Sequence, residues 1–129
     1  MSDIHGAIWW NELMTRQADQ ALVFYKRLFG WQFKSQPNAE GAMYHVAFLG
    51  DAPVAGILDM EGIARLDDKA PGWMLYVAVD DADAAVESTL AQGGALLHGP
   101  FDVPDVGRLA VLREPSGAML GVMTPAGGS

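Results

Sequence analysis

Hydrophobic positions in the first half of the chain predict one helix among four strands. Residues 4–14 are rich in Ile, Trp and Leu, which is typical of a strand that is buried on at least one face. Residues 18–29 carry apolar side chains at helical spacing, and Gly30 is a natural end for that helix. Three strand-like runs follow, separated by turns at Pro37-Asn38 and Gly50-Asp51: residues 31–35, 42–49 and 54–60.

The second half shows the same order of patterns. Residues 73–79 indicate a strand, and Asp80-Asp81 can cap a helix over residues 82–92 that Gly93-Gly94 ends. Three more strands are expected, with turns at Pro100, Pro104 and Pro115-Ser116-Gly117: residues 95–98, 108–113 and 119–124. The polar residues 61–72 between the halves are expected to form a surface linker.

The two halves are copies of one unit. A shift of 64 residues places Ala18, Asp19, Ala21 and Gly30 on Ala82, Asp83, Ala85 and Gly94. The apolar runs follow the same shift, and an internal repeat of this kind decides the fold. We therefore predict an α+β fold of one domain, residues 1–129, built from two βαβββ modules at residues 4–60 and 73–124.

Composition narrows the function classes. Half of the 129 residues are hydrophobic and 19% are charged, which is ordinary for a globular protein. With 16 acidic and 8 basic residues the net charge is -8, so we expect no binding to nucleic acid. No apolar run approaches the ~20 residues that span a membrane, and the first residues do not resemble a signal peptide. Because cysteine is absent, disulfides and thiolate chemistry are excluded, and a cytoplasmic location is expected.

Three sequence motifs, in order, resemble those of the vicinal oxygen chelate superfamily, also called the glyoxalase/bleomycin resistance/dioxygenase superfamily. These are Ala21-Leu22-Val23-Phe24-Tyr25 with Leu28-Phe29-Gly30-Trp31, then Val79-Asp80-Asp81-Ala82-Asp83-Ala84-Ala85, and Arg113-Glu114-Pro115-Ser116-Gly117. Glu114 stands where the family usually has Asp. The runs 10–15 and 101–108 look like a subgroup that includes a mycobacterial secreted antigen and actinomycete proteins labelled hydroxylases. The resemblance implies curved mixed sheets around a cavity, helices on the outside, and a homodimer.

The resemblance also locates the four places where metal-dependent members of the family hold an ion. Counting from the motifs, these are Trp10, Ile57, Met74 and Gly121, and the 64-residue shift relates Trp10 to Met74 and Ile57 to Gly121. None of the four side chains is a ligand for a divalent ion, so we predict no metal and no cofactor. If each assigned position were shifted by two residues along its strand, the side chains would still point to the same face. The shifted set could hold a metal weakly: Glu12, Asp59, Tyr76 and Met123.

Other candidate chemistry is limited. His5, His45 and His98 are too scattered to form a ligand set, and no phosphate loop or Gly-x-Ser-x-Gly motif occurs. Glu12, two residues from Trp10 in an apolar strand, is a candidate general base, unless it pairs with an Arg or leaves the sheet. Arg108 is a candidate for binding a carboxylate or phosphate, unless it pairs with Asp102 or Asp105.

These residues predict a protein that binds a small, partly apolar organic molecule. The ligand would contact residues from both modules: Trp10, Glu12, Tyr44, Ile57, Met74, Arg108 and Gly121. Tyr44 would supply a hydroxyl as the repeat counterpart of Arg108. The alternative is an enzyme of the glyoxalase type, either a metal-dependent lyase, isomerase or dioxygenase, or a metal-free catalyst that uses Glu12.

Overall fold

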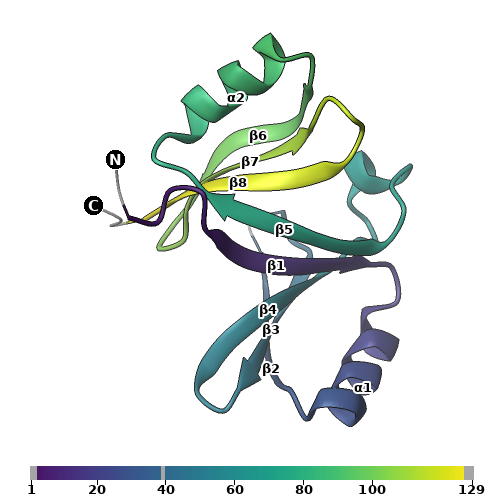
Figure 1. Ribbon diagram of the computed structural model, residues 1–129. Coiled ribbons are helices and arrows are strands. Elements are labelled where there is room, and N and C mark those ends of the chain that lie inside the picture. The colour runs from purple at the N-terminus through teal and green to yellow at the C-terminus, as the bar shows by residue number, and fades with distance from the viewer. Residues whose placement is uncertain (1–2, 39, 127–129) are drawn as a thin grey trace. The chain divides into compact units, whose positions relative to one another are not determined.

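The computed structural model describes residues 3–38 and 40–126, and these residues form eight strands and two α-helices (Figure 1). They divide into two compact units. We call residues 10–73 the N-terminal module, and residues 3–9 with 74–126 the C-terminal module. A strand that crosses one of these bounds is described with the module that holds most of its residues. No helix in the described ranges is long and apolar enough to cross a membrane.

The N-terminal module is a four-stranded mixed sheet with one helix. Along the chain its elements are β1 (Ile8–Thr15), α1 (Ala18–Phe29), β2 (Gln32–Pro37), β3 (Met43–Leu49), β4 (Ala52–Asp59) and a 3₁₀ turn (Ala64–Leu66). The strand order is β2-β3-β4-β1. The β1–β4 pair is parallel and the other pairs are antiparallel, so α1 is part of the connection that leads from β1 to its parallel neighbour.

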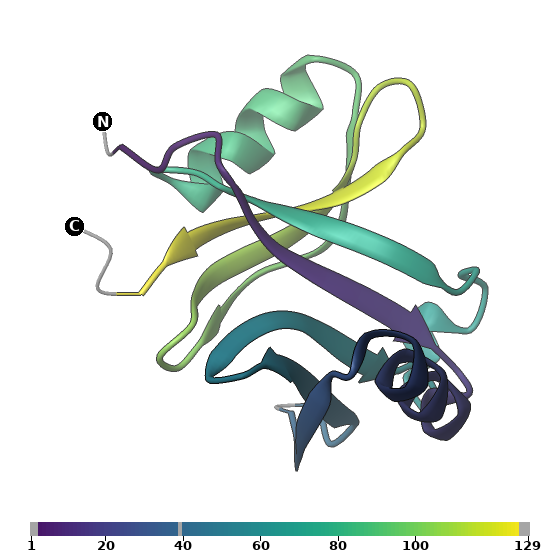
Figure 2. The ribbon, with the colours of Figure 1, turned by 60° about the horizontal axis from the view of Figure 1, so that its bottom comes forward.

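The C-terminal module repeats this plan. Its elements are β5 (Gly72–Ala78), α2 (Ala82–Ala91), β6 (Ala95–Val103), β7 (Gly107–Arg113) and β8 (Met119–Pro125). The order is β5-β8-β7-β6, and β5 is parallel to β8. In Figures 1 and 2 each helix lies beside the strands of its own module. The predicted α+β fold of two βαβββ units is confirmed, whereas the cavity stays a prediction.

Local chemistry explains why both helices fall where the sequence predicts them. Gly30 adopts the left-handed conformation (φ 75°) at the end of α1 and donates its N–H to the Lys26 carbonyl over 2.8 Å. At the start of α2, the Asp81 carboxylate accepts a hydrogen bond from the Ala84 N–H at 3.1 Å. The glycine stop and the acidic cap are therefore both used as predicted.

Several element boundaries differ from the prediction, and two of the differences change the picture of the fold. Residues 3–9 belong with the C-terminal module, because the Gly6 N–H bonds the Ala78 carbonyl at 2.7 Å and the Ala78 N–H bonds the Ala7 carbonyl at 2.9 Å. The predicted turn at Pro100 is wrong, since β6 runs through it to Val103. Strand β6 lies at the edge of the sheet and pairs with β7 through shifted registers, and such strands tolerate proline.

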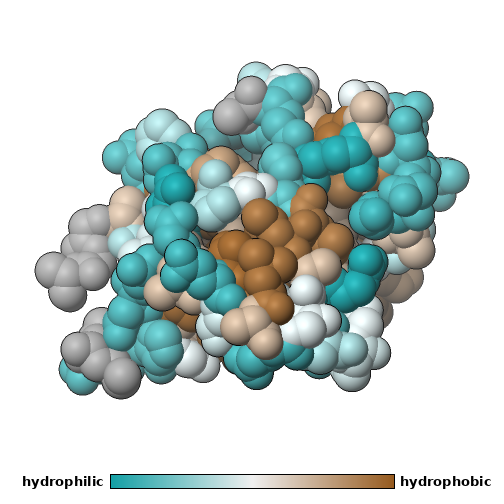
Figure 3. All heavy atoms as spheres, turned by 90° about the horizontal axis from the view of Figure 1, so that it is seen from above, coloured by the Kyte–Doolittle hydropathy of each residue, from teal (hydrophilic) through white to brown (hydrophobic). Residues whose placement is uncertain are grey.

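Each module has apolar residues buried between its helix and its sheet. In the C-terminal module Val86 of α2 packs with Ala110, Leu112 and Val122 of the sheet. In the N-terminal module α1 packs against β4, whose Ile57 is fully buried. Not all apolar surface is buried, because Figure 3 shows hydrophobic side chains gathered on one face of the molecule and bordered by hydrophilic ones.

Candidate functional site

Three of the predicted site residues share one face of the N-terminal sheet. Trp10 and Glu12 are two residues apart on β1, so their side chains point to the same face of the sheet. Glu12 pairs with Gly56 of β4, and Gly56 pairs with Val46 of β3. Tyr44 is two residues from Val46 and therefore lies on the same face. The Trp10 Nε1–H donates a hydrogen bond to the Tyr44 Oη at 2.9 Å. Three residues of the predicted site therefore share a face of the sheet, and two of them, Trp10 and Tyr44, are hydrogen-bonded.

Gly56 allows this contact to form across an intervening strand. β4 lies between β3 and β1, so a side chain from β3 must cross β4 to reach Trp10. A Cβ built on Gly56 would lie 1.7 Å from the Tyr44 Oη, so the tyrosine ring occupies the space that any other residue would fill. The missing side chain therefore gives this face an aromatic floor of Trp10 and Tyr44.

Glu12 is a buried charged residue on this face. Its side chain is 8% exposed, and among the described residues only Glu12 and His45 are buried and polar or charged. Burying a carboxylate is costly unless hydrogen bonds or an opposite charge compensate for the lost water. The carboxylate can accept hydrogen bonds or exchange a proton with a group placed on the Trp10–Tyr44 floor.

The predicted place of Ile57 in this site is wrong by one residue. Glu12 pairs with Gly56 in β1–β4, and its counterpart Tyr76 pairs with Gly121 in β5–β8. The shift is therefore 64 residues in the first strand of each module and 65 in the last, so Gly56, not Ile57, matches Gly121. A slip of one residue turns a side chain to the other face of a sheet. Ile57 matches Val122, which packs against α2, and it belongs to the core.

The C-terminal module has the same arrangement of an aromatic ring over a glycine. Met74 and Tyr76 are two residues apart on β5, so they point to the same face, and both are buried. Tyr76 pairs with Gly121 of β8. A Cβ on Gly121 would lie 2.1 Å from the Tyr76 Cδ1. The predicted residues Met74 and Gly121 therefore share a face. The sequence analysis named Tyr76 only as a member of the alternative metal-binding set. Its position two residues from Met74 on the same strand indicates that it lies on the same face as Met74.

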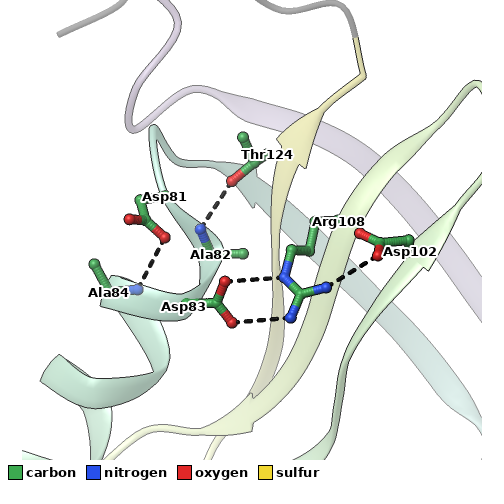
Figure 4. Close-up of polar contacts among 7 residues, drawn as sticks. All are labelled: Asp81, Ala82, Asp83, Ala84, Asp102, Arg108 and Thr124. Atoms are coloured by element: carbon green, nitrogen blue, oxygen red, sulfur yellow. Dashed lines mark hydrogen bonds and ion pairs between the residues drawn. The ribbon is translucent and has the colours of Figure 1, made fainter.

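Arg108 lies on the opposite face from Gly121 and already binds two carboxylates (Figure 4). It donates from Nε and Nη2 to the two oxygens of Asp83 at 3.0 and 3.1 Å, and from Nη1 to Asp102 at 3.1 Å. The hydrogen bond to Asp83, and after it that to Asp102, raises the pKa of Arg108. The predicted ligand role is replaced by the alternative of ion pairing, with Asp83 in place of Asp105.

The same change of shift explains the Arg108 error. Tyr44 pairs with Leu58, and Leu109 pairs with Met123, so Leu109 is the counterpart of Tyr44. Arg108, one residue earlier, points toward the helix layer and ties α2 to β7 through Asp83 of the helix. One extra residue between α2 and β7 therefore misplaced both Ile57 and Arg108 in the prediction.

The residues at the family's ligand positions do not fit a metal ion. Corrected for register, these positions are Trp10, Gly56, Met74 and Gly121, which offer an indole, a thioether and no side-chain oxygen or imidazole. Within residues 3–38 and 40–126 no group of three or more His, Cys, Asp or Glu could hold an ion. The alternative set also fails, since Asp59 pairs with Thr15 and lies on the other face from Glu12.

The three histidines lie in separate places. His45 is buried on the Ile57 face of β3, and its Nδ1 is 2.5 Å from the Ser35 Oγ. His5 accepts a hydrogen bond from the Asp80 N–H at 2.9 Å, and the His98 ring lies 4.7 Å from that of Phe101. Each histidine therefore has a local partner of its own.

Comparison with known sequences gives one family and two kinds of relatives. Residues 7–122 match the model of the Glyoxalase/Bleomycin resistance protein/Dioxygenase superfamily. The chain is 42% identical over 123 residues to CFP32 of Mycobacterium tuberculosis (strain CDC 1551 / Oshkosh), which carries the name "Putative glyoxylase". It is 33% identical over 125 residues to the anthracycline biosynthesis protein DnrV of Streptomyces peucetius. These alignments cover 94% and 95% of this chain but 45% and 43% of the relatives, so the chain spans about half of their length.

Solved structures agree on the fold. A methylmalonyl-CoA epimerase in complex with methylmalonyl-CoA and NH4+ superposes with a TM-score of 0.70 at 16% identity, covering 97% of this chain and 98% of that one. The methylmalonyl-CoA epimerase of Mycobacterium tuberculosis gives 0.64 at 20% identity, covering 98% and 91%. At these identities the likeness concerns the fold alone. Together with the family match over residues 7–122, these findings show that the chain belongs to the Glyoxalase/Bleomycin resistance protein/Dioxygenase superfamily.

Proposed function

We propose that this protein binds a small, partly apolar organic molecule without a metal ion, and that the ligand contacts the Trp10–Glu12–Tyr44 face of the N-terminal module. The observation that carries the proposal is the hydrogen bond from Trp10 to Tyr44 beside the buried Glu12. Two aromatic rings provide flat apolar contact area, and one carboxylate provides a polar anchor. The matching ligand is flat and carries an amine or a hydroxyl group.

The absence of suitable donors supports the metal-free form of the proposal. Gly56 and Gly121 supply no side chain, and Met74 offers only a thioether that divalent Ni, Mn, Zn and Fe bind weakly compared with imidazole or carboxylate. Binding must then come from shape, apolar contact and hydrogen bonds. The family provides a scaffold for this mode, and the similarity to a protein named for anthracycline biosynthesis makes polycyclic aromatic compounds sensible first ligands.

An enzyme is the second candidate, and the burial of Glu12 favours it. A carboxylate that is 8% exposed and shares a face with two aromatic rings can act as a general base or acid on a bound molecule. The relative named as a glyoxylase is consistent with this candidate. The metal-dependent form of this alternative requires ligands that the corrected positions lack.

A ligand screen with matched variants tests the proposal. Thermal shift against flat aromatic amines and phenols should give stabilising compounds, because a ligand that binds only the folded state raises its melting temperature. Glu12→Gln should weaken amine binding while leaving apolar binding largely intact. Addition of Ni, Mn, Zn or Fe(II) ions should not change the melting temperature. If one of these ions raises the melting temperature and binds with one ion per chain, the metal-free form of the proposal is contradicted. If a compound from the screen is converted by the unmodified protein and not by Glu12→Gln, the enzyme is favoured.

A further inference from the structure

The outer face of α1 is apolar, which is unusual for a helix at the surface. Val23, Phe24 and Leu28 are 50%, 56% and 57% exposed. They line a shallow groove along the helix together with Asp19, Gln20 and Arg27. A contiguous exposed apolar patch such as this stripe marks a contact with another protein chain or a membrane, or a ligand-binding groove.

The second module supplies an internal comparison. Helices α1 and α2 begin 64 residues apart, at Ala18 and Ala82, so α2 shows what the same positions carry when solvent covers them. Val23, Phe24 and Leu28 correspond to polar residues in α2 and at its C-cap: Glu87, Ser88 and Gln92. All three of these are exposed. The apolar face is therefore specific to α1 and does not follow from the fold of the module.

Charged residues at the two ends of the stripe indicate which partner fits it. Asp19, Val23 and Arg27 are four residues apart and so follow one line along the helix. Neither Asp19 nor Arg27 takes part in an ion pair within the described residues. A second copy of α1 laid antiparallel would place its Arg27 opposite Asp19, its Asp19 opposite Arg27, and its Val23 opposite Val23.

We propose that the groove of Asp19, Val23, Phe24, Arg27 and Leu28 on α1 is the contact between two copies of this chain, related by a two-fold axis through Val23. Such a surface is self-complementary, as an isologous interface must be. Phe24 and Leu28 supply the apolar anchors and the two Asp19–Arg27 pairs fix the antiparallel direction. One helix face is smaller than a standard interface, so the dimer dissociates on dilution.

Oligomeric state and cross-linking test the surface. Light scattering after gel filtration should show a monomer at micromolar and a dimer at near-millimolar concentration. The variant V23E/F24S/L28Q copies the outer face of α2 and should stay monomeric, weakening association by more than about tenfold because the apolar anchors carry most of the energy. Since the natural chain has no cysteine, Val23→Cys should form a disulfide-linked dimer on oxidation, and Glu87→Cys on α2 is the matched control that should not.

Exchange of the charges at Asp19 and Arg27 distinguishes this antiparallel dimer from nonspecific hydrophobic association. Asp19→Arg or Arg27→Asp alone should weaken the dimer through like-charge repulsion, and D19R/R27D together should restore it. These side chains are exposed, so circular dichroism should report folded proteins throughout. A monomer at every concentration overturns the proposal. So does a dimer that ignores the α1 variants, since it would use another surface, such as the apolar area in Figure 3.

Discussion

Tyr44 lies across the backbone of Gly56, with its Oη only 1.7 Å from where a Cβ on that glycine would stand. This close approach lets a side chain of β3 reach Trp10 of β1 over the intervening β4. The glycine is therefore required by packing and not by backbone conformation. The Trp10–Tyr44 contact on which the proposed site rests depends on it.

Gly56→Ala should destabilise the protein by about 1–3 kcal/mol, because the new methyl group forces Tyr44 out of its place. Urea unfolding measures the free energy of unfolding. Gly72→Ala is the matched control, since a Cβ there meets nothing within 4 Å. In a Tyr44→Ala background the added cost of Gly56→Ala should shrink. Equal costs in both backgrounds would show that Tyr44 is not the neighbour that matters.

Ile57 should matter for stability and not for ligand binding. It is fully buried and shares a face with the core, so Ile57→Val should cost about 0.5–1.5 kcal/mol and Ile57→Ala about 2–5 kcal/mol. Calorimetry or urea unfolding gives these values, and titration of Ile57→Val with a ligand from the screen should give the dissociation constant of the unmodified protein. A large change in affinity without a change in stability would return Ile57 to the site.

Arg108 should act as a tie between α2 and β7. Arg108→Gln should lower the melting temperature, with a larger effect at low salt because exposed ion pairs are screened. Asp83→Asn should have a larger effect than Asp102→Asn, since Asp83 accepts two of the three hydrogen bonds. Arg113→Gln, at the other end of β7, is the comparison variant. A ligand whose binding is lost in Arg108→Gln at unchanged stability would contradict this role.

The turn between β7 and β8 should show a pH-dependent contribution. The Ser116 hydroxyl donates to the Glu114 carboxylate, and this bond, with that from the Ala118 N–H, lowers the pKa of Glu114. A lowered pKa means that the turn stabilises the fold above the ordinary carboxyl range and loses this effect as pH falls through the pKa of Glu114. NMR titration should find that Ser116→Ala raises this pKa and Ser116→Thr preserves it. An unchanged pKa in Ser116→Ala would assign the shift to another group.

The sequence predicts most of the fold because its signals are local. The Asp81 cap, the Gly30 stop and the alternation of Trp10 and Glu12 each act within a few residues. The register of the last strands is different, since it depends on how many residues lie between α2 and β7. Because the C-terminal module has one extra residue there, a constant shift of 64 assigns Ile57 and Arg108 to the wrong face of the sheet. No short-range pattern in the sequence indicates this extra residue. Tyr44 shares a face with Trp10 and is hydrogen-bonded to it, although Arg108, which suggested it as a repeat counterpart, does not correspond to it in register.

Ligand titration followed by tryptophan fluorescence tests the central claim most directly, because Trp10 forms half of the proposed floor. Trp10→Phe and Trp31→Phe are a matched pair, since Trp31 stacks with Tyr25 of α1 and takes no part in the proposed site. With a flat aromatic amine from the screen, the unmodified protein and Trp31→Phe should show saturable quenching that Trp10→Phe loses. Quenching that persists in Trp10→Phe with the same dissociation constant would place the ligand elsewhere and contradict the account.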